Sequence, residues 1–138
     1  MKLTTLKTSL KFLLSSISAA MASPTLVPDV PTSVAGIESV CTGIGLDTRQ
    51  DPRWNNYSLK VEIVGPGGQY LGDEGVTVRR SGKELISLSC SGPWILFQLP
   101  QGRYEVEARI GAQTASSAAF VPATGQGRII LRFAGDAQ

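Results

Sequence analysis

The sequence of 138 residues predicts an all-β fold, and more specifically a seven-stranded antiparallel β-sandwich. Two observations carry this prediction. Hydrophobic and polar residues alternate in short runs from Asn56 onward, and turns rich in glycine and proline separate these runs at spacings of roughly eight to twelve residues. A third observation is that the sequence shows no long helical periodicity. Together they indicate one domain that is large enough to bury a hydrophobic core.

The first predicted strand, Tyr57–Ile63, alternates hydrophobic and polar residues and ends at the turn Gly65–Gly68. The second is interrupted: it covers Gln69–Leu71, breaks at a glycine-rich turn and resumes at Val76–Arg79. The remaining strands are predicted at Glu84–Cys90, Trp94–Leu99, Arg103–Ile110, Gln113–Val121 and Arg128–Phe133.

Two of these strands differ from the others in composition. Trp94–Leu99 is hydrophobic on both faces, which predicts a place in the middle of the sandwich. Gln113–Val121 consists mainly of Ala, Ser and Thr, which predicts a weak strand at a sheet edge. An exposed edge is a surface on which a strand of a partner protein can pair, so this segment is the first candidate for partner binding.

The N-terminus predicts export. Residues 1–22 have the pattern of a signal peptide, with basic lysines, a short apolar stretch at Phe12–Ala20 and small residues at Ala20 and Ala22 for cleavage. An ordinary amphipathic N-terminal helix is the alternative. We therefore expect a periplasmic or secreted protein. No apolar stretch of the sequence is long enough to span a bilayer, so we expect no stable membrane insertion.

Residues 23–55 are predicted to lie outside the sandwich domain, which is assigned to residues 56–134. Pro24, Pro28 and Pro31 disfavour helix and sheet interior, so the segment that holds them is predicted as an extended linker. The rest of the range, up to residue 55, is predicted as an ordered but irregular lead-in.

The charge of the domain excludes one class of partner. Ten basic and eleven acidic residues follow Ala22, so the basic excess of the whole chain belongs to the first 22 residues. Proteins that bind nucleic acid keep clustered Lys and Arg in the folded domain. We therefore expect no nucleic-acid partner.

Cys41 and Cys90 are the two cysteines of the chain. In an oxidising compartment such an isolated pair most often forms a disulfide, here closing a loop of about 50 residues. Two free buried thiols are the alternative if the protein stays in the cytosol.

The residue types exclude most catalytic chemistry. The chain has no histidine, which excludes serine–histidine and cysteine–histidine nucleophile pairs and histidine zinc sites. Glu105 and Glu107 share one face of a predicted strand, about 7 Å apart, a spacing found in some glycosidases. An exposed strand offers no cleft to separate two carboxyl pKa values, so we interpret them as a solvated face with Arg103 and Arg109.

Two further acidic residues, Asp73 and Glu74, lie in a glycine-flanked loop. The loop lacks the ordered oxygen ligands of a calcium site, so we interpret both as solvated turn residues. We expect no enzymatic activity, no metal and no other cofactor.

Aromatic side chains on a β-sandwich surface can stack against sugars. Trp54 and Tyr70 are predicted near the surface and form the candidate ligand surface, whereas Trp94 is predicted to lie in the core. Two aromatic residues are few for a sugar-binding platform, so this surface supports a second hypothesis only.

Two motifs resemble a known family. Leu71–Val78 leads through small and acidic residues into a valine-rich strand, and Gln98–Val106 holds a leucine-proline-x-glycine turn followed by a tyrosine-valine strand. Both resemble the carboxypeptidase regulatory-like domains, also described as transthyretin-like or prealbumin-like, over roughly Asn56 to Phe133. Within that group, Asn56–Lys60 and Ser91–Trp94 resemble a small exported proteobacterial subfamily of unassigned function.

The resemblance implies a transthyretin-like sandwich with Greek-key connections. It also implies a domain without chemistry of its own, which serves as a binding or interaction module. The function expected from the sequence is therefore an exported, non-catalytic module that binds a protein partner. The alternative is a carbohydrate-binding module that recognises a cell-envelope glycan.

Overall fold

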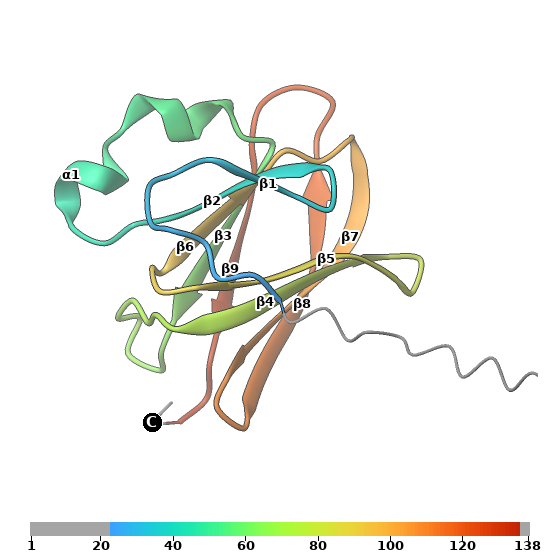
Figure 1. Cartoon of the computed structure of the whole chain (residues 1–138). Helices are drawn as coiled ribbons and strands as arrows, with labels where there is room; N and C mark the ends of the chain where they lie inside the picture. The colour runs from blue at the N-terminus through green and yellow to red at the C-terminus, as the bar shows by residue number, and fades with distance from the viewer. Residues whose placement is uncertain (1–22, 136–138) are drawn as a thin grey trace, which may run out of the picture.

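The computed structural model describes residues 23–135, and the predicted signal peptide lies outside these residues. In the described part, two sheets face each other as a sandwich, with few residues in helices (Figure 1). The first sheet has the order β1 (Thr32–Val34), β2 (Ile37–Thr42), β6 (Trp94–Phe97), β3 (Leu59–Val64) and β9 (Gly127–Arg132). The second has the order β5 (Lys83–Cys90), β4 (Glu74–Arg80), β7 (Gly102–Ile110) and β8 (Gln113–Val121).

The predicted all-β sandwich is confirmed, but the described residues form nine strands and not seven. The two additional strands, β1 and β2, lie within residues 23–55, so this range is not only a linker and an irregular lead-in. They form a hairpin whose turn, Ala35–Gly36, has positive φ at both residues. Ala is a rare residue in such a turn, which is why the sequence did not indicate a hairpin.

Residues before β1 also belong to the domain. The Leu26 side chain is buried in the main core, and Leu26 N–H donates to the Ser89 carbonyl oxygen at 3.0 Å. Ser89 N–H in turn donates to the Pro24 carbonyl oxygen at 2.8 Å. The proline-containing segment is therefore extended, as predicted, but it pairs along the outer edge of β5 and is part of the fold.

The prediction of a purely antiparallel sandwich is wrong at one position. β9 pairs with β3 in parallel, from Leu59 opposite Gly127 to Val64 opposite Arg132. All other pairs between named strands in the described part are antiparallel. The alternation of hydrophobic residues along a strand is the same in both cases, so the sequence pattern does not reveal the direction.

The core lies between the two sheets and follows the predicted alternation. Inward-facing residues of β7 are buried, and the Tyr104 hydroxyl donates to the Pro100 carbonyl oxygen at 2.5 Å. The predicted central place of the Trp94–Leu99 segment is also confirmed, since β6 lies between β2 and β3. Ile95 and Phe97 belong to this main core.

The other face of β6 is covered by a third layer. The helices α1 (Leu46–Arg49) and η1 (Pro52–Asn56) lie outside the five-stranded sheet (Figure 1). Here Trp54 and Tyr57 pack on Val40 of β2 and Leu96 of β6. This layer explains why β6 is hydrophobic on both faces.

Cys41 and Cys90 form a disulfide, with Cα atoms 5.5 Å apart. Cys41 belongs to β2 and Cys90 to β5, so the bond joins the two sheets of the sandwich. This confirms the pairing predicted from the two cysteines.

Candidate functional site

The structure does not bring the two predicted ligand-binding aromatic residues together. Only 3% of Trp54 is exposed, so its prediction as a surface residue is wrong. Asp51 caps η1 by accepting a hydrogen bond from Arg53 N–H, and the helix turns Trp54 onto the sheet. The Trp54 Nε1–H donates to the Thr48 carbonyl oxygen at 2.7 Å, which satisfies its buried donor.

Tyr70 remains at the surface, with 40% of the residue exposed. Its predicted strand, Gln69–Leu71, is reduced to one isolated bridge between Tyr70 and Val64. The Tyr70 ring stands edge-on to Trp94, with centroids 6.1 Å apart. Trp94 is buried, as predicted, but it lies on the outer side of β6 and not between the sheets.

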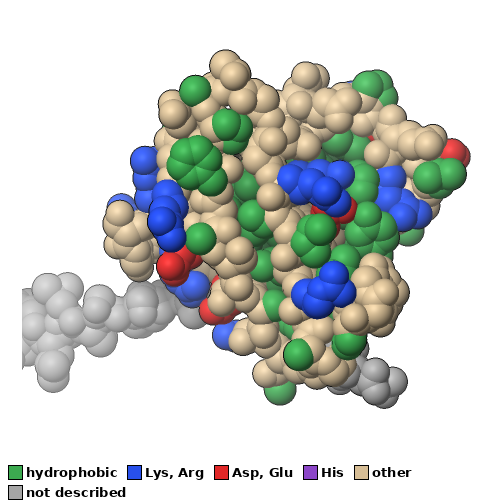
Figure 2. Space-filling view, turned by 180° about the vertical axis from the view of Figure 1, so that it is seen from behind, with side chains coloured by type: hydrophobic (Ala, Val, Ile, Leu, Met, Phe, Trp, Pro, Cys, Tyr) green, Lys and Arg blue, Asp and Glu red, His purple; other side chains and the backbone are tan. Residues whose placement is uncertain are grey.

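We call the area around Tyr70, Trp94, Lys60, Glu62 and Arg128 the β3–β9 face. Pairing between strands explains why these residues meet: Glu62 lies opposite Trp94 of β6, and Lys60 lies opposite Arg128 of β9. The surface view in Figure 2 shows basic side chains set among hydrophobic ones on one side of the molecule.

Glu62 is the centre of a polar network on this face. The sequence pattern placed it on the polar side of its strand, yet only 2% of it is exposed. Its carboxylate accepts hydrogen bonds from the Tyr70 hydroxyl at 2.9 Å and from Arg128 Nε. Burial by itself would raise the pKa of Glu62, but the hydrogen bonds from Arg128 and Tyr70, together with the charges of Lys60 and Arg128, outweigh burial and lower it. Glu62 is therefore a buried anion that holds two surface side chains in place.

Two cations lie against the aromatic rings of the same face. Lys60 Nζ is 3.3 Å from the centroid of the Trp94 ring, and Arg49 Cζ is 5.1 Å from that of Tyr70. Burial lowers the pKa of Lys60. Cation–π contacts of this kind fix the direction of long, otherwise mobile side chains. They also occupy the ring faces on which a sugar would stack.

The second candidate surface is the edge strand β8. Among the strands of residues 23–135 it pairs with β7 alone, which confirms the predicted edge position. Its nine residues include no charged side chain, and Ser116, Ser117 and Ala118 are exposed. The Ala118 carbonyl oxygen accepts a hydrogen bond from the Ser117 hydroxyl at 2.8 Å. Phe120, 65% exposed, lies beside Arg103 of β7 and is the most exposed aromatic residue of the described part.

The predicted carboxylate pair, Glu105 and Glu107, lies on the outer face of the four-stranded sheet. Glu107 forms ion pairs with Arg79 at 3.8 Å and Arg109 at 3.7 Å. Arg109 is thus one of the partners predicted for it. Cation pairing of Glu107 on an open strand supports the interpretation of these acids as a charged surface.

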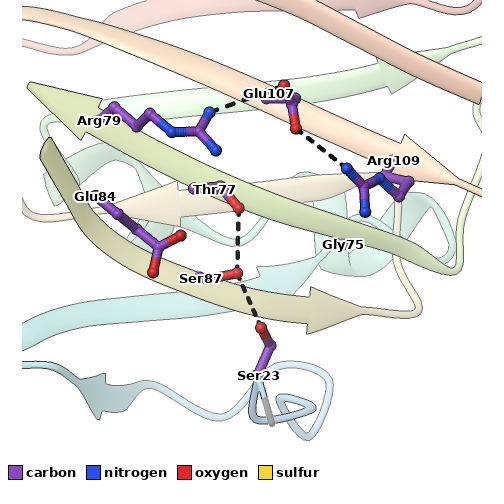
Figure 3. Close-up of a pocket in the computed structure, with 8 residues that line it drawn as sticks. All are labelled: Ser23, Gly75, Thr77, Arg79, Glu84, Ser87, Glu107 and Arg109. Atoms are coloured by element: carbon purple, nitrogen blue, oxygen red, sulfur yellow. Dashed lines mark hydrogen bonds and ion pairs between the residues drawn. The ribbon is translucent and has the colours of Figure 1, made fainter. Parts of the chain in front are cut away.

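These ion pairs border a shallow hollow of about 320 Å³ on the same sheet (Figure 3). Along its lower side the hydroxyl groups of Thr77, Ser87 and Ser23 form a chain of hydrogen bonds, at 3.1 and 2.9 Å. The hollow thus presents hydroxyl groups, the ion pairs of Glu107 and the carboxylate of Glu84.

Glu74 differs from its prediction as a solvated turn residue. It is the first residue of β4, lies opposite Cys90 of β5 and is 1% exposed. Neither carboxyl oxygen has a hydrogen-bond partner among residues 23–135, and burial raises the pKa of Glu74 to about 9. Asp73 is exposed, so the two acids do not point into one site. The described residues contain no cluster of three or more potential metal ligands.

None of the helices formed by residues 23–135 has the length and apolar character needed to cross a membrane. In comparisons with known proteins, neither a family model nor a curated protein sequence matches this chain.

Proposed function

We propose that this protein is an exported, non-catalytic interaction module that captures an extended segment of a partner protein along β8. The single observation that carries the proposal is the long, uncharged and exposed edge of this strand. Pairing with an added strand satisfies the free N–H and C=O groups of such an edge.

The other sheet edges of the described part are better protected, which favours β8. Residues Pro24–Leu26 hydrogen-bond along β5, and β1 has only three residues. β9 carries Arg128 and Arg132, and charged side chains oppose pairing at an edge. β8 has nine residues, carries no charged side chain and has no strand paired on its outer side in the described part, so a partner strand meets the least resistance there.

The family resemblance is part of this proposal. Carboxypeptidase regulatory-like domains with transthyretin-like, Greek-key topology serve as binding modules without chemistry of their own. The tyrosine turn at Gln98–Val106, with its Tyr104–Pro100 hydrogen bond, supports the resemblance. The signal-peptide pattern and the disulfide between Cys41 and Cys90 support a place in the periplasm or outside the cell.

The alternative, a carbohydrate-binding module of the cell envelope that uses Trp54 and Tyr70, has less support. Trp54 is buried, and the Tyr70 ring is in contact with Trp94 and Arg49. A sugar needs a free and flat ring face, which these two residues do not form.

Ala118→Pro tests the edge, with Ala118→Ser as the matched control. Proline removes one N–H from the strand, whereas serine keeps it. A photo-crosslinking residue placed at Ser116 in the exported protein is expected to yield a defined partner adduct, identified by mass spectrometry. The adduct should be lost with Ala118→Pro and kept with Ala118→Ser. An unchanged adduct in a folded Ala118→Pro variant would show that β8 is not the binding edge.

A further inference from the structure

The β3–β9 face holds two cations, Lys60 and Arg128, next to the buried carboxylate of Glu62. Lys60 and Arg128 lie directly opposite each other on the neighbouring strands β3 and β9. Like charges at such positions destabilise a sheet. Glu62 forms an ion pair with Arg128 and accepts a hydrogen bond from Tyr70, and the charge of Lys60 acts on it as well.

This charge is a local feature. The residues after Ala22 carry ten basic and eleven acidic side chains, so the domain as a whole has no basic excess. On the opposite sheet, Arg79 and Arg109 share Glu107 within ion-pair distance. On the β3–β9 face, Lys60 lies over the Trp94 ring, and the charges of Glu62 and Arg128 act on it.

Arg128 is oriented for binding. Its Nε is held by Glu62, while 57% of the side chain is exposed. The two terminal Nη groups have no further hydrogen-bond partner among residues 23–135. A guanidinium group held in this way presents its outer N–H groups to a carboxylate or sulfate in the two-pronged geometry that both anions favour.

We propose that Lys60 and Arg128 form an oxyanion-binding site for acidic polysaccharides, with a carboxylate or sulfate group of the polymer held between the two cations. A bound anion would reduce the repulsion between Lys60 and Arg128, which destabilises the sheet when no anion is bound. This site is on the other sheet from β8 and is independent of strand capture there.

The surroundings favour a sugar polymer over other anions. The site is an open face, where a single ion pair binds weakly, so a lone anion gains little. A polymer with repeated charges gains affinity by rebinding at high local concentration. Ile130 of β9 is exposed beside Arg128 and offers apolar surface to the C–H groups of sugar rings.

The experiment measures binding of the exported protein to polygalacturonate, which carries carboxylates, and to dextran sulfate, with neutral dextran as the reference polymer. We expect saturable binding to at least one acidic polymer and none to neutral dextran. The polymer that binds more tightly shows whether the site prefers a carboxylate or a sulfate group. Lys60→Gln and Arg128→Gln should each weaken binding by roughly tenfold, as expected for loss of one charge-assisted contact.

Three further variants serve as controls. Arg103→Gln removes an exposed arginine from the other sheet and should leave binding unchanged. Lys60→Arg keeps the charge and should keep binding, which preserves the test if the glutamine variants unfold. Ala118→Pro should bind the polymers normally, so failure of strand capture and failure of this site are distinguishable.

The proposal is overturned if neither acidic polymer binds, or if Arg103→Gln weakens binding as much as Arg128→Gln does. It is also overturned if polyglutamate binds more tightly than both acidic polysaccharides through the same two residues. In that case the site recognises acidic peptides.

Discussion

At the residue scale, two buried glutamates show how the same side chain takes opposite protonation states. Glu62 is buried with hydrogen bonds from Arg128 and Tyr70, and its pKa is lowered. Glu74 is buried between the sheets without such partners, and burial raises its pKa to about 9. Burial penalises the charged form of a carboxyl group unless donors compensate. Glu62 is therefore ionised and Glu74 neutral at pH 7.

The raised pKa of Glu74 predicts that the protein loses stability as pH rises. The unfolded chain releases this proton near 4.5, the ordinary pKa of a glutamate carboxyl group, whereas the folded chain keeps it up to about pH 9. The contribution of Glu74 to stability is therefore greatest below pH 4.5 and is lost as the pH rises between these two values. Between pH 5 and pH 8 the loss is at most roughly 4 kcal/mol. Urea unfolding at both pH values measures it.

Glu74→Gln is the control for this prediction. The variant has no carboxyl group at this position, so the drop in unfolding free energy from pH 5 to pH 8 should be much smaller than in the unmodified protein. Equal pH dependence in both proteins would show that Glu74 does not titrate as its burial indicates.

At the scale of elements, the segment before β1 is a structural part of the domain. Leu26 is buried in the core, whereas its neighbour Val27 is 63% exposed. We expect Leu26→Ala to lower the free energy of unfolding by about 2–4 kcal/mol, because it leaves a cavity in the core. Val27→Ala should change it little. Chemical denaturation of the two variants compares them directly, and equal effects would indicate that the segment is not docked.

The layer formed by α1 and η1 leads to a second prediction at this scale. Trp54 covers Val40 and Leu96, so Trp54→Ala is expected to lower the unfolding free energy by about 3 kcal/mol or more. Trp54→Phe should recover part of this loss. The thermal unfolding midpoints of both variants are the measurement, and an unchanged midpoint for Trp54→Ala would contradict the structural role argued for this residue.

At the scale of the whole molecule, the disulfide holds the two sheets together. Cys41 and Cys90 are 49 residues apart in the sequence and belong to different sheets. Replacing both by alanine frees this long loop in the unfolded chain, and we expect a loss of about 2–4 kcal/mol in the free energy of unfolding. Denaturation of the double variant tests this. If its stability equals that of the oxidised protein, the bond contributes nothing to the fold.

The alternation of residues along the strands determined the fold class and the inward faces of β3, β5 and β7, and the hydrophobic residues on both faces of β6 determined its central place. The composition of Gln113–Val121 determined its edge position, and the two cysteines determined the disulfide. These features could be predicted because they depend on the hydrophobicity of local segments. The number of strands could not be predicted, because the β1–β2 hairpin has an unusual Ala–Gly turn and β2 is covered on both faces.

The composition of the candidate sites was decided by the tertiary structure. β9 follows all four strands of the second sheet in the chain and then pairs with β3 in parallel. This pairing brings Arg128 next to Lys60 and Glu62. Trp54 packs on the five-stranded sheet and does not form a surface with Tyr70. The aromatic residue in contact with Tyr70 is Trp94. Local sequence patterns report which side of a strand is buried, but contacts between residues far apart in the chain depend on strand order and direction, which those patterns do not encode.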